Sequence, residues 1–349
     1  MMASAARQEQ HQAPHAARLD ALSALDAPAA LHLPEHLRDP APEVQRVAIR
    51  HLADQADWTG LDWPELLDVL MALGRVDIPL SRLTEGHVDA MRILAEAGAS
   101  PEPAALYGVW ASRSGGTGLS GGASGAEPDR QTEWHVRGTL LFASGAGVLD
   151  RALVTVWPEQ DRHVLLDAAV ADWSFDAGAW HTRAMEHSRS HRAHLDGPVA
   201  ARRIGADGFY LGRPGFFPGG AGVAAVWTGG AARVLDLLGA RLGERPALPE
   251  PKRLRWGHAR TELASAVALI RQTGTALRAP GQSASRTAVT LCRAGVGAAV
   301  RRLLEQVRTL AGPAGLAFDE DLTRAVDDLA LYVAQQSQDG DAGHLGALP

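Results

Sequence analysis

The chain has 349 residues, more than one ordinary hydrophobic core holds, so two or three domains are predicted. Its 34 Lys and Arg are interspersed with 40 Asp and Glu, giving a formal net charge of −6, which argues against a general nucleic-acid surface. The single cysteine, Cys292, rules out an internal disulfide and favours a cytoplasmic location. No apolar run approaches the roughly 20 residues of a membrane span. The first 20 residues are expected to form a polar tail.

Residues 1–103 are predicted to form an N-terminal helical domain. Apolar residues recur at helical spacing in four runs, at 19–25, 44–52, 66–73 and 88–95. Prolines separate these runs, and Gly98 is a plausible end for the last helix before Pro101.

Residues 104–210 are predicted to form a small antiparallel β-barrel. Five of the nine tryptophans lie here, among short β-type runs separated by turn residues: ALYGVWA, EWHVRGTLLFAS, RALVTVW, RHVLLDAAV and HRAHLDG. The glycine- and serine-rich segment 114–125 lacks the ending of a phosphate-binding loop, and we expect a flexible connection there.

Residues 211–349 are predicted to form a C-terminal four-helix bundle, which completes an α+β multidomain fold. Apolar residues at steps of three and four run through 223–237, 263–277, 289–310 and 322–333. Small residues at 294–299 would let another helix approach closely, so we expect a homodimer or homotetramer paired through these helices.

Several segments together resemble the acyl-CoA dehydrogenase superfamily. The order of the predicted domains (helical, β, helical) is also the order found in that family. The segment 77–98 resembles the helix pair that closes its N-terminal domain. The segments 107–112 and 138–154 resemble its two flavin-binding strands, and 213–231 resembles the start of its first bundle helix. Leu310, Gly312 and Gly315 keep the shape of the glycine turn before its last helix, with one residue inserted.

The resemblance implies an FAD cofactor. On the first strand, Val109 and Trp110 take the family's flavin-contacting positions, and Trp110 replaces a threonine that donates to the pyrimidine edge. On the second strand, Phe142 keeps an aromatic wall, and Ser144 keeps a hydroxyl that could donate toward flavin N5 or O4. The alternative is that Trp110 and Phe142 are barrel core.

The resemblance also implies contacts to the cofactor diphosphate across a subunit boundary. Arg241 falls near the family's arginine for this purpose, although the Phe-Gly that should follow is absent. Arg308 stands at the glutamine before the glycine turn that contains Gly312, and it could meet a phosphate as a bidentate donor. Alternatively, both arginines lie on solvated helix faces.

The catalytic base of the family has no clear counterpart. Its glutamate position is occupied by Gln336, whose amide cannot take a proton from carbon. Gln336 follows apolar residues at helical steps, so it is expected to face the interior or the pocket. Asp339, Asp341 and Glu85 are weak candidates for the base, with capping or surface roles as the alternative. The catalytic residue therefore stays unknown, and little or no dehydrogenation of simple acyl-CoA esters is expected.

Two further clusters lie within 181–203. Four histidines there are not expected to bind a metal, because a zinc site needs three or four converging ligands. Five arginines could receive a CoA phosphate or form a solvated face. Two functions stay open: an FAD-dependent oxidoreductase acting on CH–CH groups of an acyl-CoA-like thioester or related carbonyl compound, and a non-catalytic binding or scaffold protein of the same fold.

Overall fold

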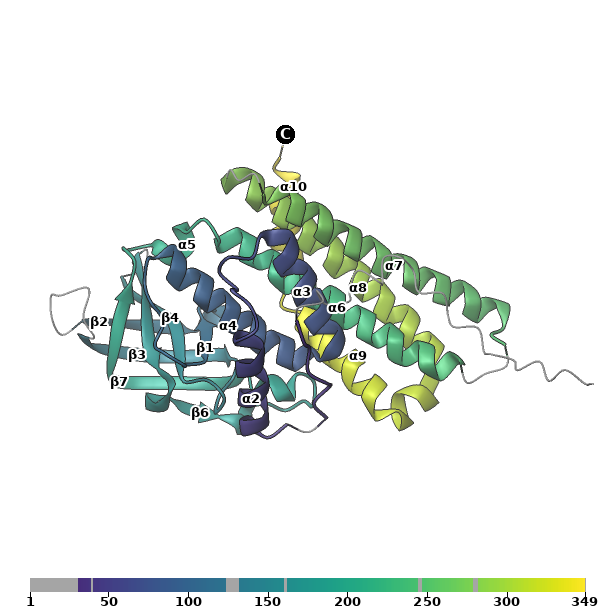
Figure 1. Cartoon of the computed structure of the whole chain (residues 1–349), viewed down its shortest axis with the longest axis horizontal. Coiled ribbons are helices and arrows are strands. Elements are labelled where there is room, and N and C mark those ends of the chain that lie inside the picture. Colours follow the sequence, from purple (N-terminus) through teal and green to yellow (C-terminus); the bar gives the residue numbers. More distant parts are fainter. Residues whose placement is uncertain are drawn as a thin grey trace, which may run out of the picture.

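The computed structural model describes residues 31–38, 40–123, 132–159, 162–243, 247–278 and 282–348. The predicted apolar run at 19–25 lies outside these residues. Figure 1 shows a β-barrel on one side of the molecule and long helices on the other, with α4 lying across the barrel. The fold is therefore α+β, as predicted.

Three helices precede the barrel: α2 (Pro42–Ala53), α3 (Trp63–Val76) and α4 (Ile78–Glu96). Each has a proline in its first turn, where the missing N–H costs no helical hydrogen bond. Asp62 begins α3 with a capping box to Glu65, and Asp77 caps α4 through the Leu80 N–H. The expected helix pair at 77–98 is wrong, since α4 is one continuous helix.

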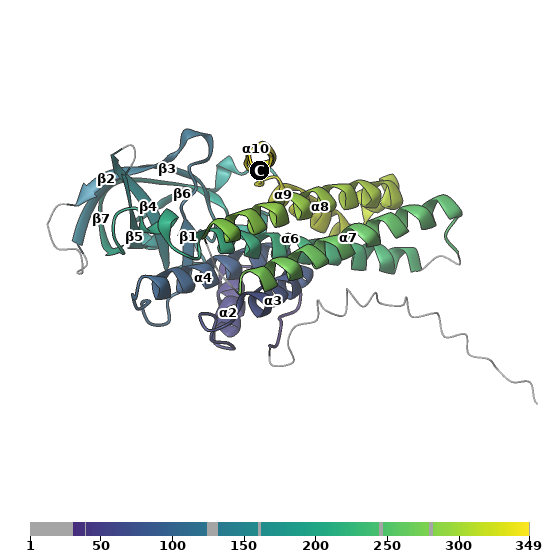
Figure 2. The same cartoon turned by 90° about the horizontal axis from the view of Figure 1, so that it is seen from above.

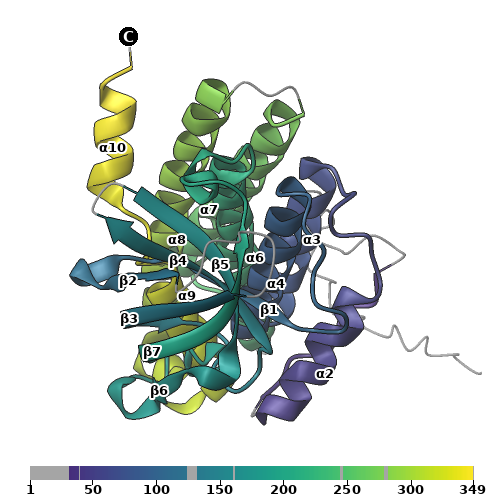
Figure 3. The same ribbon diagram turned by 90° about the vertical axis from the view of Figure 1, so that its left-hand side faces the viewer.

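The barrel contains β1 (Tyr107–Trp110), β2 (Gly118–Ala123), β3 (Thr132–Ala143), β4 (Arg151–Glu159), β5 (Arg162–Ala169), β6 (Ser174–Asp176) and β7 (His191–Ile204). Its sheet runs β1-β4-β2-β3-β7-β5, and β5 pairs back with β4, which closes the ring seen in Figure 3. Short 3-10 helices lie at Ser114–Gly116, Val170–Asp172, Ala177–Ala179 and Glu186–Ser188.

Two expectations for this region are wrong. The barrel is not wholly antiparallel, because β1 and β2 both pair in parallel with β4. The segment 114–125 is not merely a connection, because its residues 118–123 form β2 against β3 and β4. A Cβ at Gly121 would lie 2.1 Å from the His135 carbonyl oxygen, so glycine permits this close pairing. The strand lacks alternating apolar residues, which explains why its pattern gave no strand signal.

The remaining helices are α5 (Phe209–Gly212), α6 (Phe216–Gly243), α7 (Glu250–Ala276), α8 (Gln282–Phe318), α9 (Glu320–Val333) and α10 (Gln338–Gly346). Figure 2 shows α6, α7, α8 and α9 side by side. Their core is shared with α3, whose leucines belong to the same buried cluster. The division at 103 and 210, and a C-terminal bundle of four helices as its own domain, stay predictions. The helix α10 was not predicted.

The helix α6 is, in the described part of the chain, the one helix long and apolar enough to cross a membrane, with 78% of its most apolar window buried inside the fold. Small residues on α6 let α3 approach it closely: a Cβ at Gly229 would lie 2.0 Å from the Met71 carbonyl oxygen. The apolar content of α6 is thus used in packing against neighbouring helices.

Candidate functional site

A cavity of about 470 Å³ lies where the barrel meets the helices. Its wall comes from the end of β1 and the residues after it (109–112), the end of β3, the loop 180–190, and the C-terminal end of α9 (331–335). Arg82 of α4 completes the lining. Five separate parts of the chain therefore build one site, of a size and mixed character typical of a small-molecule pocket.

All four residues predicted on the two strands line this cavity: Val109, Trp110, Phe142 and Ser144. Trp110 is also barrel core, since it is 2% exposed and its ring meets the Trp173 ring edge-on at 5.4 Å. Its indole N–H donates to the Ser144 carbonyl at 3.0 Å, which ties β1 to the end of β3.

Phe142 is not core. It is 47% exposed, and its ring meets the Trp180 ring edge-on at 6.4 Å. The exposed Phe142 ring and the half-buried Trp180 ring lie together at the rim of the cavity, where they are available to pack against a flat ligand. Trp180 belongs to no recognisable motif and was not predicted as a site residue.

Three serine hydroxyls form a chain at one side of the cavity. The Ser144 Oγ lies 2.8 Å from the Ser190 Oγ, which lies 2.7 Å from the Ser188 Oγ. The Ser188 hydroxyl donates to the Met185 carbonyl at 2.6 Å. All three serines are buried. Ser188 and Ser190 were not predicted as site residues, because nothing in HSRSHR distinguishes them from surface serines.

The loop that carries Ser188 and Ser190 is held in a strained form. Met185 and Arg189 have φ angles of 53° and 48°, a region that residues with a side chain rarely adopt. The Asp328 carboxylate of α9 accepts from the Met185 N–H at 2.5 Å. The amide of Gln45 on α2 donates to the His187 carbonyl at 2.6 Å. Contacts from two helices thus fix the serine chain.

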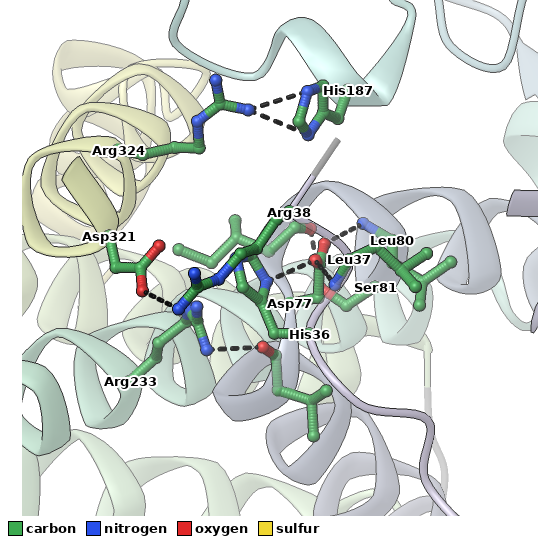
Figure 4. Close-up of polar contacts among 12 residues, drawn as sticks. His36, Leu37, Arg38, Asp77, Leu80, Ser81, His187, Arg233, Asp321 and Arg324 are labelled. Carbon is green, nitrogen blue, oxygen red and sulfur yellow. Dashed lines mark hydrogen bonds and ion pairs between the residues drawn. The ribbon is translucent and has the colours of Figure 1, made fainter. Parts of the chain in front are cut away.

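The same loop meets the outer face of α9, as Figure 4 shows. The Arg324 guanidinium points at the His187 ring, with 2.7 Å between Nη1 and Nε2. Nearby, Arg38 forms an ion pair with Asp321 at 2.9 Å. The segment before α2 is therefore joined to α9 beside the loop.

Glu85 is buried, so the expected surface or capping role is wrong. Its carboxylate accepts from the Arg82 guanidinium at 2.9 Å, and Arg82 lines the cavity. Burial raises the pKa of Glu85 to about 7, although the charge of Arg82 opposes this shift. Glu85 is thus a titratable group one side chain away from the cavity.

His87, which the sequence places beside Glu85, has a different role. Its Nδ1 accepts from the Tyr107 N–H at 3.1 Å, and burial lowers its pKa to about 4. It is therefore neutral at pH 7 and joins α4 to β1.

Gln336 does not line the cavity. The helix α9 ends at Val333, and the Gln336 side chain turns between α8 and α10. It accepts from Arg301 at 2.6 Å and donates to the Asp341 carboxylate at 2.9 Å. Asp339 is exposed on α10. Both ends of the amide are satisfied, so this side chain has a structural role in the described chain.

The three residues expected to reach a diphosphate also lie outside the cavity lining. Gly312 breaks α8 with a φ of 64°, directly before Pro313, so a turn does exist there. Arg241 lies 3.6 Å from Asp319, and Arg308 is exposed on α8. Their contact with a neighbouring subunit's cofactor stays a prediction.

The arginine cluster within 181–203 is largely neutralised. Arg183, Arg192, Arg202 and Arg203 pair with Glu320, Asp176, Asp167 and Asp207. Arg189 instead donates to the Gln45 amide oxygen at 3.0 Å. This pairing favours the solvated face over a CoA-phosphate site. Across the described ranges, no group of three or more His, Cys, Asp or Glu is placed to hold a metal.

We expect Asp328→Asn to stabilise the protein at high pH. Burial raises the pKa of Asp328 to about 7, above its unfolded value. The folded state therefore binds more protons between about pH 4 and 7, and the wild type loses stability as pH rises through that window. Asparagine keeps the acceptor for the Met185 N–H without this cost.

The gain in the free energy of unfolding should be roughly 2 to 4 kcal/mol at pH 8 and shrink toward zero at pH 4. Urea denaturation at several pH values measures it. Asp327→Asn, on the exposed neighbour, removes only a minor repulsion and should therefore change the pH profile far less than Asp328→Asn. An equal gain at every pH would contradict the assignment of a raised pKa.

Comparison with known proteins places the fold. No protein-family model matches the sequence, and no curated protein matches it. A dibenzothiophene monooxygenase (TdsC) from a Paenibacillus species superposes with a TM-score of 0.70 and 17% identity over 88% of this chain and 89% of that chain. KijD3 in complex with FMN and a dTDP-linked amino keto sugar superposes with a TM-score of 0.69 and 15% identity, over 93% and 97%.

A third solved structure, XiaF from a Streptomyces species in complex with FADH2 and glycerol, superposes with a TM-score of 0.67 and 16% identity over 89% of this chain and 88% of that chain. These are flavin-dependent enzymes with an acyl-CoA dehydrogenase-like fold. The resemblance expected from the sequence is therefore confirmed, and at these identities it is a likeness of fold.

Proposed function

We propose that this chain is a flavin-dependent oxidoreductase that uses reduced flavin to oxygenate a small organic molecule. The observation that carries the proposal is the convergence of Val109, Trp110, Phe142 and Ser144 on one cavity. The similar structures support it, since one is named a monooxygenase and others hold FMN, FADH2 or indole.

The cavity suits a flavin ring by its chemistry. The exposed Phe142 ring and the half-buried Trp180 ring offer a wall for a flat aromatic system. The Ser144 hydroxyl and the Arg82 guanidinium offer polar contacts at its edge. A reduced flavin bound there would supply two electrons to dioxygen, with one oxygen atom entering the substrate and the other leaving as water. Either FMN or FAD could supply this chemistry, and FAD follows from the family resemblance alone.

Oxidation of an acyl thioester is the less supported activity. It needs a base at the substrate α-carbon, and neither Gln336 nor Asp339 lines the cavity. Oxygenation makes no such demand at that position. The non-catalytic scaffold is the other alternative, and it predicts that neither redox state of a flavin binds.

Titration of the purified protein with FMN and FAD tests the proposal. Each flavin should be added both oxidised and, without oxygen, reduced, with binding followed by absorbance, by quenching of protein tryptophan fluorescence and by calorimetry. At least one flavin should bind at micromolar concentration. Dioxygen admitted to the reduced complex with indole as a probe should then yield a product one oxygen atom heavier. Absence of binding for every flavin form at 100 micromolar would favour the scaffold.

A further inference from the structure

The directions of the three serine hydrogen bonds follow from the distances and from the carbonyl group at one end of the chain of hydroxyls. Two oxygen atoms 2.6 to 2.8 Å apart need one hydrogen between them, because two lone pairs at that distance repel. The Met185 carbonyl can only accept, so Ser188 must donate to it. Because its only hydroxyl hydrogen is donated to this carbonyl, Ser188 must accept from Ser190.

Ser144 is the last of the three hydroxyls and lines the cavity. Because the hydrogen of the Ser190 hydroxyl is donated to Ser188, Ser190 must accept from Ser144. Ser144 then has no hydrogen left, and its Oγ offers lone pairs to the cavity that it lines. This role is the opposite of the one expected from the family resemblance, in which the Ser144 hydroxyl donates to the flavin.

The surroundings of the three serines oppose a reversal of the donor and acceptor roles along their hydrogen bonds. All three serines are at most 7% exposed, which limits the access of water to their hydroxyl groups. The terminal acceptor belongs to Met185, whose left-handed conformation is held by Asp328 through its N–H. Its carbonyl also accepts from the Ser188 N–H at 2.9 Å, which fixes the turn.

We propose that the chain Ser188–Ser190–Ser144 makes Ser144 an obligate hydrogen-bond acceptor and thereby selects reduced flavin over oxidised flavin. The reduced ring carries a hydrogen on N5, whereas N5 of the oxidised ring offers a lone pair. The inference rests on the proposed function and on N5 facing Ser144, as the family resemblance implies. It assigns Ser188 and Ser190 as positioning residues, which touch no flavin atom themselves.

Ser190→Ala tests the proposal, because it frees the Ser144 hydrogen and lets that hydroxyl donate to oxidised N5. The ratio of the Kd for oxidised flavin to the Kd for reduced flavin should be larger in the wild type than in the variant. We expect this ratio to fall about tenfold in Ser190→Ala, because the Ser144 hydroxyl gains one hydrogen bond to oxidised N5. The midpoint potential of the bound flavin should correspondingly become more negative by about 30 mV.

Further variants distinguish a change in hydrogen-bond direction from a change in the fold. Ser188→Ala also removes the fixed direction of these bonds and should lower the ratio of the two Kd values. Ser190→Thr keeps the hydroxyl and should preserve that ratio. Ser120→Ala removes an exposed hydroxyl on β2 that donates to the Arg137 carbonyl, and it should change neither constant. Thermal unfolding of each variant shows that it is folded.

The outcomes distinguish this proposal from the one it rests on. If no flavin form binds the wild type, the proposed function fails and the serine inference falls with it. If flavin binds, but the wild type and the folded Ser190→Ala and Ser188→Ala variants have the same ratio and potential, only the serine inference is overturned. A ratio lowered in both alanine variants and retained in Ser190→Thr supports it.

Discussion

Gly229→Ala should lower the free energy of unfolding by about 3 kcal/mol, the upper end of the usual cost of overpacking. The new Cβ would lie 2.0 Å from the Met71 carbonyl oxygen and 2.9 Å from the Arg75 nitrogen. Both atoms are backbone of α3, so no side-chain rotation relieves the clash. The contact is mutual, because a Cβ at Gly74 would lie 2.5 Å from the Val226 carbonyl oxygen. The helices α3 and α6 would have to separate, and both contribute to the main helical core.

Gly257→Ala is the matched control for this prediction. Gly257 also lies inside a long helix, α7, but a Cβ there has nothing within 4 Å. The same change should therefore stabilise the protein by about 0.5 to 1 kcal/mol through helix propensity. Chemical denaturation of both variants measures the difference. A Gly229→Ala variant as stable as the wild type would show that α3 and α6 do not pack at this distance.

Ala334→Trp should abolish flavin binding, raising the Kd at least about 100-fold. Ala334 caps the C-terminal end of α9 and lines the cavity with an exposed methyl group. An indole on this position would take the space that the flavin ring needs. Because Ala334 is exposed and follows the last residue of α9, the fold should tolerate the larger side chain.

Fluorescence titration and thermal unfolding together check this result. Ala268→Trp places the same side chain on the exposed face of α7 and should leave the Kd unchanged. Undiminished flavin binding by a folded Ala334→Trp variant would place the flavin outside this cavity. Loss of binding together with a large loss of stability would instead show that the change acts through the fold.

Local patterns were enough for most elements. The runs at 66–73 and 88–95 correspond to α3 and α4, and the long run at 289–310 lies within α8. The strands at 107–110, 132–143 and 151–159 were also expected, because alternation and turn residues are properties of neighbouring residues. The strand β2 was missed since its stability comes from β3 and β4 and not from its own side chains.

The sequence also located one part of the candidate site. The strand resemblance identified Val109, Trp110, Phe142 and Ser144, which do converge on the cavity. Trp180 and Ser190 were missed as site residues because they come from segments without a motif. Arg82 and Tyr332 lie in segments that resemble the family, but the resemblance implied no flavin contact at their positions. Gln336 is buried, as expected, but it faces the helical interior and not the cavity. Only the packing of α8 and α10 decided between these two directions.

The sequence by itself determined the α+β architecture and the two strands that line the cavity, because periodicity and motif spacing are local. The tertiary structure alone decided the environment of Glu85 and the direction of the Ser144 hydrogen bond. A carboxyl group titrates according to the groups packed around it, and a hydroxyl donates or accepts according to which partners remain. The Ser144–Ser190 pair is 46 residues apart in the chain and the Met185–Asp328 pair is 143 apart, so no local pattern contains either contact.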